Sequence, residues 1–342
     1  MMARRHAPQR TLRARGAALL AAMLTVTLVA TIAATAVWQQ WRNLEVEGAE
    51  RTRVQAAWLL LGGLDFSRHV LRQDARTSGG VDSLSEPWAV PLAEARLSTF
   101  LQASNNQTNV DDSTIDAAQA FLSGAIVDAQ SRLNIRNLVD SDQLNPVAVK
   151  QFSRLFERLG LPGAQLTVLS QAALQAMRGQ NRPENAPLTP STFKELAWWG
   201  LPPSTLAVLE PYVSLLPAKT KLNINTASAT VLWAAIDGLD FATAQQIVQQ
   251  RQSTVFDRVS DLSGRYPKNE AITAAAGNTA LLDVSSAYFD VWVRLRFDDL
   301  AVQERSLVYR QGLSVKTVVR ERGAAMPVSA LGDSAGTPGA PQ

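Results

Sequence analysis

The stretch that decides the fold runs from Ala17 to Val37 and reads AALLAAMLTVTLVATIAATAV. No charged residue occurs between Arg15 and Arg42. A helix needs roughly 20 apolar residues to span a bilayer, so the stretch predicts a transmembrane helix. The leader before it carries five arginines and no acidic residue, and a basic flank stays on the cytoplasmic side. The sequence therefore predicts a membrane-anchored protein with its remaining residues outside the cytoplasm.

The residues around this stretch allow three fates. Ala34-Thr35-Ala36 fits a secretory cleavage site that would release a soluble protein, although the apolar run exceeds the roughly 7–15 residues of an ordinary signal core. Arg15-Gly16-Ala17, followed by an apolar helix start, resembles the prepilin-peptidase site of type IV pilins and type II secretion pseudopilins. That enzyme cuts on the cytoplasmic side, and the apolar segment is kept. The third fate is an uncleaved signal anchor.

The prepilin resemblance implies cleavage between Gly16 and Ala17 and N-methylation of Ala17. Major pilins and most pseudopilins carry Glu at the fifth mature position, which here is Ala21. A carboxylate in lipid is costly unless it is paired, and in the family it is thought to pair with the terminal amine of the next subunit. A subunit that lacks it fits a filament tip. This absence is typical of the minor pseudopilin K family of type II secretion systems.

Composition and charge agree with an exported protein. The chain has 342 residues, which is long enough for one large or two small domains. It has no cysteine, which excludes disulfides and thiol chemistry. Its net charge of +3 falls to about −2 once the five leader arginines are removed, because 28 basic residues then face 30 acidic ones. The basic balance therefore comes from the leader and does not indicate nucleic-acid binding.

The helix is expected to continue outward from the membrane to about Ser78. Trp38 and Trp41 lie where aromatic residues favour the bilayer interface, and an apolar stripe at helical spacing follows them. Gly79-Gly80 ends the pattern. Such a long N-terminal helix is the hallmark of a pilin-like fold.

Two further segments resemble the K family. Residues 82–89, DSLSEPWA, resemble its Trp-Ala segment before the first strand, and residues 124–138, GAIVDAQSRLNIRNL, resemble its strand-turn-strand. Family members usually have Gly in place of Ser131, which leaves the turn type open. The residues alone predict a polar hairpin turn from Asp128 to Ser131 between two short strands, with no catalytic role.

The spacing of apolar residues then changes twice along the chain. Residues 139–283 show helical spacing, with an apolar face that includes Phe152 and Leu155 and a break at 161–163. Alternating apolar residues then predict three strands within 289–297, 302–309 and 313–319, forming an antiparallel meander. The final residues, rich in Gly, Pro, Ser and Ala, predict disorder.

One motif favours a different function. Residues 222–262 resemble the helix-hairpin-helix module that competence DNA receptors carry behind a membrane anchor. Such hairpins usually read Gly-Ile/Leu-Gly, and their backbone amides approach a phosphate. Here Asp240 replaces the second Gly and Asp237 precedes Gly238-Leu239, so two carboxylates oppose an anionic backbone. The K family carries a degenerate copy of the same motif. The structural interpretation is that Asn225 and Thr226 cap a helix start.

Other chemistry is sparse. The histidines are His6 and His69, which excludes a metal site built from several His and Cys ligands. Acidic residues cluster at Asp111-Asp112, Asp140/Asp142 and Asp298-Asp299, where oxygen atoms could hold calcium. Some K-family members bind calcium, so the resemblance allows it as a cofactor. No metal ligand is assigned, and solvated loops explain each cluster more simply.

Together these features predict an α+β, pilin-like fold: a long N-terminal helix on an antiparallel sheet, with a large inserted all-helical domain that contains a degenerate helix-hairpin-helix. The chain is identified as a member of the minor pseudopilin K family, which implies a non-enzymatic tip subunit that nucleates and caps the pseudopilus. Implied partners are minor pseudopilins I and J, H below them, the prepilin peptidase and the inner-membrane platform, with no nucleic acid expected. The implied location is the inner membrane, single-pass, with the globular part in the periplasm. The alternative is a membrane-anchored DNA-binding protein of the competence type.

The expected division of the chain follows from the same patterns. It comprises a leader at 1–16, a transmembrane part at 17–37, a first pilin-like part at 38–138, the helical insert at 139–283, C-terminal pilin-like strands at 284–321 and a disordered tail at 322–342.

Overall fold

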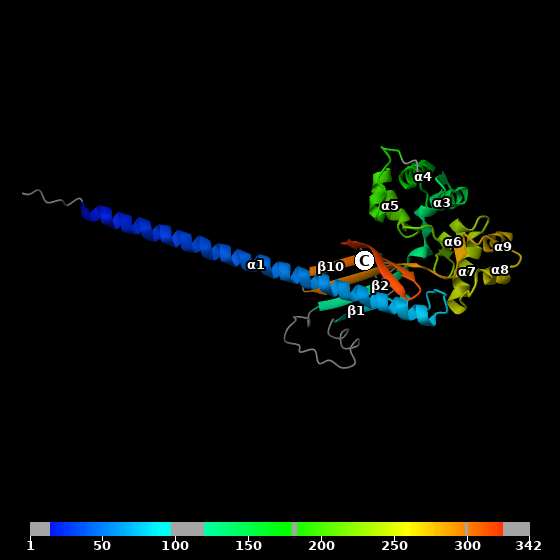
Figure 1. The fold of residues 1–342 in the computed structure, drawn as a ribbon, viewed down its shortest axis with the longest axis horizontal. Helices are drawn as coiled ribbons and strands as arrows, with labels where there is room; N and C mark the ends of the chain where they lie inside the picture. The colour runs from blue at the N-terminus through cyan, green and yellow to red at the C-terminus, as the bar shows by residue number, and fades with distance from the viewer. Residues whose placement is uncertain (1–13, 97–119, 180–182, 298–299, 324–342) are drawn as a thin grey trace, which may run out of the picture. The chain divides into compact units, whose positions relative to one another are not determined.

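The computed structural model describes residues 14–96, 120–179, 183–297 and 300–323. Helix α1 runs from Ala14 to Thr77 (Figure 1), close to the predicted span, and the glycines that end it, Gly79 and Gly80, have positive φ. The chain divides into two compact units between Trp58 and Leu59, so α1 contributes to both units. The expected tail and the Asp111-Asp112 and Asp298-Asp299 clusters fall outside the described residues, apart from the first two positions of the tail.

The first unit is the N-terminal part of α1. By length and composition this helix could cross a membrane, and its large apolar side chains between Leu19 and Val37 are exposed. Threonines interrupt the apolar run, but the hydroxyl of Thr25 donates to the Ala22 carbonyl at 2.8 Å, and other threonines bond in the same way. Because these hydroxyls are satisfied within the helix, they do not oppose burial in lipid.

The second unit contains a five-stranded sheet in the order β1-β2-β9-β10-β11, in which all neighbours are antiparallel. The predicted meander is confirmed, because β9, β10 and β11 follow one another in sequence and in the sheet. The predicted Trp-Ala segment forms a short 3-10 helix, η1, ahead of β1, with Trp88 buried. The bounds are η1 Pro87–Ala89, β1 Leu92–Arg96, β2 Ala120–Asp128, β9 Tyr288–Phe297, β10 Leu300–Gln311 and β11 Ser314–Arg322.

The C-terminal part of α1 packs on this sheet. Leu60, Leu64 and Leu71 are buried, and Arg68 donates to the Val315 carbonyl at 2.6 Å. Gly63 allows the helix to approach closely, because a Cβ there would lie 2.7 Å from Val293 Cγ1. A long N-terminal helix on an antiparallel sheet is the predicted pilin-like arrangement.

The insert lies between β2 and β9, which are neighbours in the sheet although the insert separates them in sequence. Figure 1 shows α3 to α5 in green and α6 to α9 in yellow as two groups of helices. The predicted apolar face of α3 is buried through Phe152, Leu155 and Phe156. The bounds are α3 Pro146–Arg158, α4 Gly163–Met177, η5 Phe193–Trp199, α5 Pro203–Leu209, α6 Ala229–Ala235, α7 Phe241–Ser253, α8 Val259–Arg265 and α9 Glu270–Gly277.

Two-residue strands also occur between β2 and β9; of these, the sequence predicted a short strand only after the 128–131 turn, where β3 (Leu133–Asn134) lies. A two-residue turn joins β4 (Val139–Asp140) to β5 (Gln143–Leu144), with positive φ at Ser141 and Asp142. Positive φ at both central residues is the geometry of a tight hairpin turn. Parallel pairs join β3 to β6 (Val213–Ser214) and β7 (Leu222–Asn223) to β8 (Leu282–Asp283).

The predicted hairpin turn from Asp128 to Ser131 is wrong. Strand β2 pairs with β1 and β9, whereas β3 pairs with β6, so the two strands flanking the turn belong to different sheets. Asp128 caps a 3-10 turn, η3 (Ala129–Ser131), by accepting from Gln130 N at 2.7 Å. The Ser131 hydroxyl donates back to the Asp128 carbonyl, and Ser131 does not have positive φ. The turn therefore does not need glycine, and it leads the chain from the sheet into the insert.

Candidate functional site

Polar residues gather where the sheet meets the insert, and Asp128 lies at their centre. Its side chain is buried at the end of β2. The hydroxyls of Thr226 and Ser286 donate to one carboxylate oxygen at 2.5 and 2.7 Å. Asn223 Nδ2 donates to the same oxygen at 3.1 Å. Three segments distant in sequence thus meet on one carboxylate.

Burial has a large electrostatic effect at Asp128. Loss of water raises the pKa of its carboxyl from 3.8 to about 6, although the donors from Thr226 and Ser286 and from the Gln130 amide oppose the shift. The nearby charge of Asp82 raises the pKa further. This carboxyl can therefore change its protonation state close to neutral pH.

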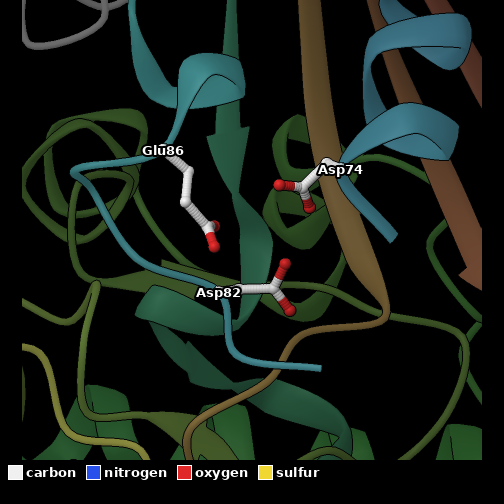
Figure 2. A group of neighbouring side chains, drawn as sticks. All are labelled: Asp74, Asp82 and Glu86. Atoms are coloured by element: carbon white, nitrogen blue, oxygen red, sulfur yellow. The ribbon is translucent and has the colours of Figure 1, made fainter. Parts of the chain in front are cut away.

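A second acidic group lies beside the junction, formed by Asp74, Asp82 and Glu86. Each offers a carboxylate oxygen within 4.8 Å of the others. Figure 2 shows the three carboxylates pointing toward one another from α1 and from the segment that leads to η1. Oxygen ligands at such spacing are of the kind that hard cations prefer.

Protein donors already occupy this group. Arg310 donates to Asp74 at 2.7 Å and to both oxygens of Asp82 at 2.5 and 2.6 Å. Glu86 accepts from the Trp88 indole at 2.6 Å and from the Ser83 amide at 3.0 Å. Arg310 thus ties Asp74 on α1 and Asp82 to β10, whereas Glu86 is held by donors of its own segment.

Burial disfavours the ionised forms of two of these carboxyls, Asp74 and Glu86. Burial raises the pKa of Asp74, although the hydrogen bond and charge of Arg310 act against it. Burial likewise raises the pKa of Glu86, against the donors from Ser83 and Trp88. Both groups therefore favour protonation more in the folded chain than in water.

The acidic pair proposed from sequence at Asp140 and Asp142 is divided between different partners. Asp140 accepts from Lys219 Nζ at 2.5 Å, which lowers the pKa of its carboxyl. Asp142 accepts from the Gly179 amide at 2.9 Å. Both residues belong to the β4–β5 hairpin and have protein partners. Calcium binding, which the resemblance implies for some family members, stays a prediction.

The proposed helix cap by Asn225 and Thr226 is wrong. Ser228 is the N-cap of α6 and accepts from the Val231 amide. Asn225 instead bonds the backbone of Phe256, donating to its carbonyl at 2.9 Å and accepting from its amide at 3.1 Å. The Thr226 hydroxyl donates to the Asp128 carboxylate. Neither side chain caps α6, because Asn225 bonds the Phe256 backbone and Thr226 bonds Asp128.

The same loop is held from its other side by Arg251 on α7. This guanidinium is buried and donates to the carbonyls of Ile224 and Ala227, both at 2.6 Å. Burial lowers the pKa of Arg251 to about 10, so it stays charged at neutral pH. The Arg in the helix-hairpin-helix motif is therefore a structural residue that fixes the loop.

The two aspartates of the hairpin have local partners. Asp240 caps α7 by accepting from the Thr243 amide at 2.8 Å, and Asp237 lies 2.6 Å from Lys150 Nζ and 3.5 Å from Arg154. Their partners lower the pKa values of both carboxyls. The Thr243 amide, one of those that a phosphate would need at the start of α7, is thus capped by a carboxylate.

The residues proposed for processing lie at the start of α1. Gly16 and Ala17 are in its first turns, and Ala17 and Ala21 are exposed. No acidic residue lies in the first turn. Sequence reasoning proposed these processing residues. It missed the contacts of Asp74, Asp82, Arg310 and Asp128, because their partners come from distant segments.

Comparisons with known proteins agree with the fold. Two family models match the chain, both described as type II secretion system (T2SS), protein K: one over residues 131–218 and one over residues 222–285.

Similar relatives cover most of the chain. The type II secretion system protein K of Pseudomonas aeruginosa is 28% identical over 329 residues, covering 89% of this chain and 88% of its own. Those of Pectobacterium carotovorum subsp. carotovorum and Dickeya chrysanthemi are 26% and 27% identical, each covering 91% of this chain and 97% of its own.

A solved structure shares the fold. It is the GspK-GspI-GspJ complex from the type 2 secretion system of enterotoxigenic Escherichia coli. The matched chain has a TM-score of 0.63 and 17% identity, and the alignment covers 81% of this chain and 99% of that chain.

Proposed function

We propose that the chain is a type II secretion system protein K, the minor pseudopilin at the pseudopilus tip, because two family models of that description match it and relatives of that name cover most of it. There it would nucleate and cap the filament that serves export of folded proteins across the outer membrane. The observation that carries the proposal is one continuous helix, α1, that joins an exposed apolar segment to a pilin-like sheet with a bulky insert. The proposed role is structural and involves no catalysis.

The apolar segment supports two successive roles. Residues 17–37 would anchor the subunit in the inner membrane before assembly, with the globular part in the periplasm. Beyond them, large apolar side chains remain exposed at Leu44, Val54 and Trp58. Apolar side chains on the water-exposed part of a helix indicate a packing surface. In a filament they would pack against the helices of neighbouring subunits.

Ala21 supports a place at the tip. A subunit with Glu at this position can pair it with the terminal amine of the subunit ahead, but Ala21 offers no carboxylate. We therefore place no subunit ahead of this one. The insert, expected at residues 139–283, would block further addition above the sheet.

The expected partners are minor pseudopilins I and J, with H below them, after processing by the prepilin peptidase and on the inner-membrane platform. The neighbouring solved structure is a complex of GspK with GspI and GspJ, and this supports the first two partners. The test is co-expression of the full chain with I and J, followed by detergent extraction and affinity purification. A stable ternary complex is expected, and its absence with all three proteins folded would refute the proposal.

Surface variants sharpen this test. Leu44→Arg and Trp58→Arg change exposed side chains of α1, so they should leave the fold intact and reduce recovery of I and J. Trp198→Arg is the matched control, because Trp198 is similarly exposed but lies in the insert. Equal recovery from all three variants would show that this part of α1 is not the assembly surface.

The competence-type alternative is a DNA-binding protein. Its best cationic candidates, Lys219 and Lys221, are paired with Asp140 and Asp283 at 2.5 and 3.2 Å, which disfavours phosphate binding. A gel-shift assay at moderate salt separates the two functions. Retention of DNA that is lost on changing both lysines would favour the alternative.

A further inference from the structure

A fully buried carboxylate joins the sheet to the insert. Asp128 ends β2, and its side chain accepts hydrogen bonds from the 223–226 loop of the insert and from Ser286, just before β9. Asn223 extends the junction by donating to the Asp82 carbonyl at 3.0 Å. The Asp128 side chain thus accepts hydrogen bonds from both segments that meet the end of β2, and Gln130 adds a bond from its Nε2 to the Lys221 carbonyl at 3.2 Å.

The donors around Asp128 suit two protonation states. Two of them, Thr226 and Ser286, are hydroxyls, which can donate or accept. When Asp128 is protonated, its O–H can donate to either hydroxyl, while the Gln130 amide still donates to the other carboxyl oxygen. Asp290, also buried, differs because the guanidiniums of Arg132 and Arg305 hold it. Protonation there would leave two cations without their partner.

The charges around the junction favour proton uptake. In the part of the chain that the structure describes, no cationic side chain hydrogen-bonds the Asp128 carboxylate. The charge of Asp82, on the segment after α1, raises the pKa of Asp128, and Arg310 from β10 is bound to Asp82 and Asp74. Other anions on the surrounding elements are Glu86, Asp283 and Asp290, and other cations are Arg132, Lys221 and Arg251.

We propose that Asp128 is a proton-sensitive latch: mild acidification adds a proton to its side chain and holds the 223–226 loop more firmly against β2. The sign follows from burial, which raises the pKa to about 6 from 3.8. The docked form binds the proton more tightly than a form open to water, so docking gains stability as pH falls through about 6. It loses that gain as pH rises.

Hydrogen exchange of the full chain in detergent micelles tests the latch. Protection of amides 223–227, corrected for intrinsic exchange, is compared at about pH 5 and about pH 7.5, with amides 291–295 as internal reference. Protection should rise about tenfold at the lower pH. Asp128→Asn, which is neutral at both values, should remove the rise, whereas Asp237→Asn, at an exposed carboxylate, should keep it. A flat wild-type response, or a rise that persists in Asp128→Asn, would overturn the proposal.

Infrared spectroscopy gives a second measurement if Asp128→Asn does not fold. A buried carboxylic-acid band should titrate near pH 6 in the wild-type chain. Ser286→Ala removes a donor that favours the ionised form, so it should move that midpoint upward. Thr243→Val, which changes the hydroxyl partner of exposed Asp240, should not move it. Absence of the band at about pH 5, or an unmoved midpoint in Ser286→Ala, would refute the latch.

Discussion

Arg310 and Asp82 form a buried ion pair in which one guanidinium nitrogen lies 2.5 and 2.6 Å from the two carboxylate oxygens. The same guanidinium reaches Asp74 on α1 and the Ser286 carbonyl. One side chain of β10 therefore connects the N-terminal helix, the segment that follows it and the start of β9. Removing one partner of such a pair costs more than the pair itself contributes, because a buried charge is left alone.

Arg310→Met should reduce the free energy of unfolding by about 3–5 kcal/mol near pH 7. The loss should be smaller near pH 5. Burial already raises the pKa of Asp74, and removal of the guanidinium raises it further, so the folded chain binds a proton more tightly and regains stability as pH falls. Denaturant unfolding in detergent at both pH values measures this.

Arg296→Met is the control for that experiment. Arg296 pairs with Glu94 at 2.7 Å on a half-exposed surface, where a pair contributes about 1 kcal/mol or less. Equal losses in both variants, or a loss in Arg310→Met that does not change with pH, would contradict the role of Arg310.

Gly63→Ala should destabilise the fold. The new Cβ would lie 2.7 Å from Val293 Cγ1, and valine is too stiff to move aside freely, so overpacking should cost about 1–3 kcal/mol. Val293→Ala in the same chain should recover part of the loss. Thermal unfolding followed by circular dichroism measures both variants.

The adjacent glycine provides the opposite expectation. Gly62 is exposed, and a Cβ there would meet nothing within 4 Å. Gly62→Ala should therefore stabilise the helix by roughly 0.5–1 kcal/mol. If both substitutions shifted the unfolding midpoint in the same direction, close packing at Gly63 would not be their explanation.

The mature protein from membranes should begin at Ala17 and carry the mass of one added methyl group. N-terminal sequencing and intact mass measure this, and substitution of Gly16 should prevent the cut. A chain that begins at Val37 would instead be a released soluble protein, and the tip mechanism would have to be abandoned.

Asn225→Leu should cost about 2–3 kcal/mol, because it removes both bonds to the Phe256 backbone and leaves a buried amide and carbonyl without partners. Asn278→Leu, at the end of α9, changes a more exposed amide and should cost less. Chemical denaturation ranks the two. A reversed order would show that Asn225 does not fix the loop.

Local patterns in the sequence predicted the parts of the fold that depend on neighbours along the chain. The uncharged run after Arg15 predicted the apolar helix, alternation around Val291 predicted strand β9, and the spacing of Phe152 and Leu155 predicted the buried face of α3. Each pattern reports one face of one element, and the structure confirms them.

Features that depend on distant partners were missed or misjudged. Aspartate is a residue type common in turns, so the sequence indicates only a turn at Asp128. Its place at the centre of a junction depends on hydrogen bonds from Thr226 and Ser286, which are distant in sequence. Asn225 and Thr226 stand where a helix cap would be expected, but tertiary partners take both side chains and Ser228 caps instead. Arg310 gave no local signal because its acidic partners lie more than 200 positions away.

The pairing of β2 with β9 has a consequence for the order of folding. Asp128 and Ser286, at the ends that must meet, are 158 positions apart. Closing so long a loop in a disordered chain is entropically costly and slow. If the insert folds first, it brings the end of β2 and the start of β9 together before these two strands pair. The insert would then act as an internal chaperone for the sheet during synthesis, and changes in its length would be tolerated as long as its two ends still emerge side by side.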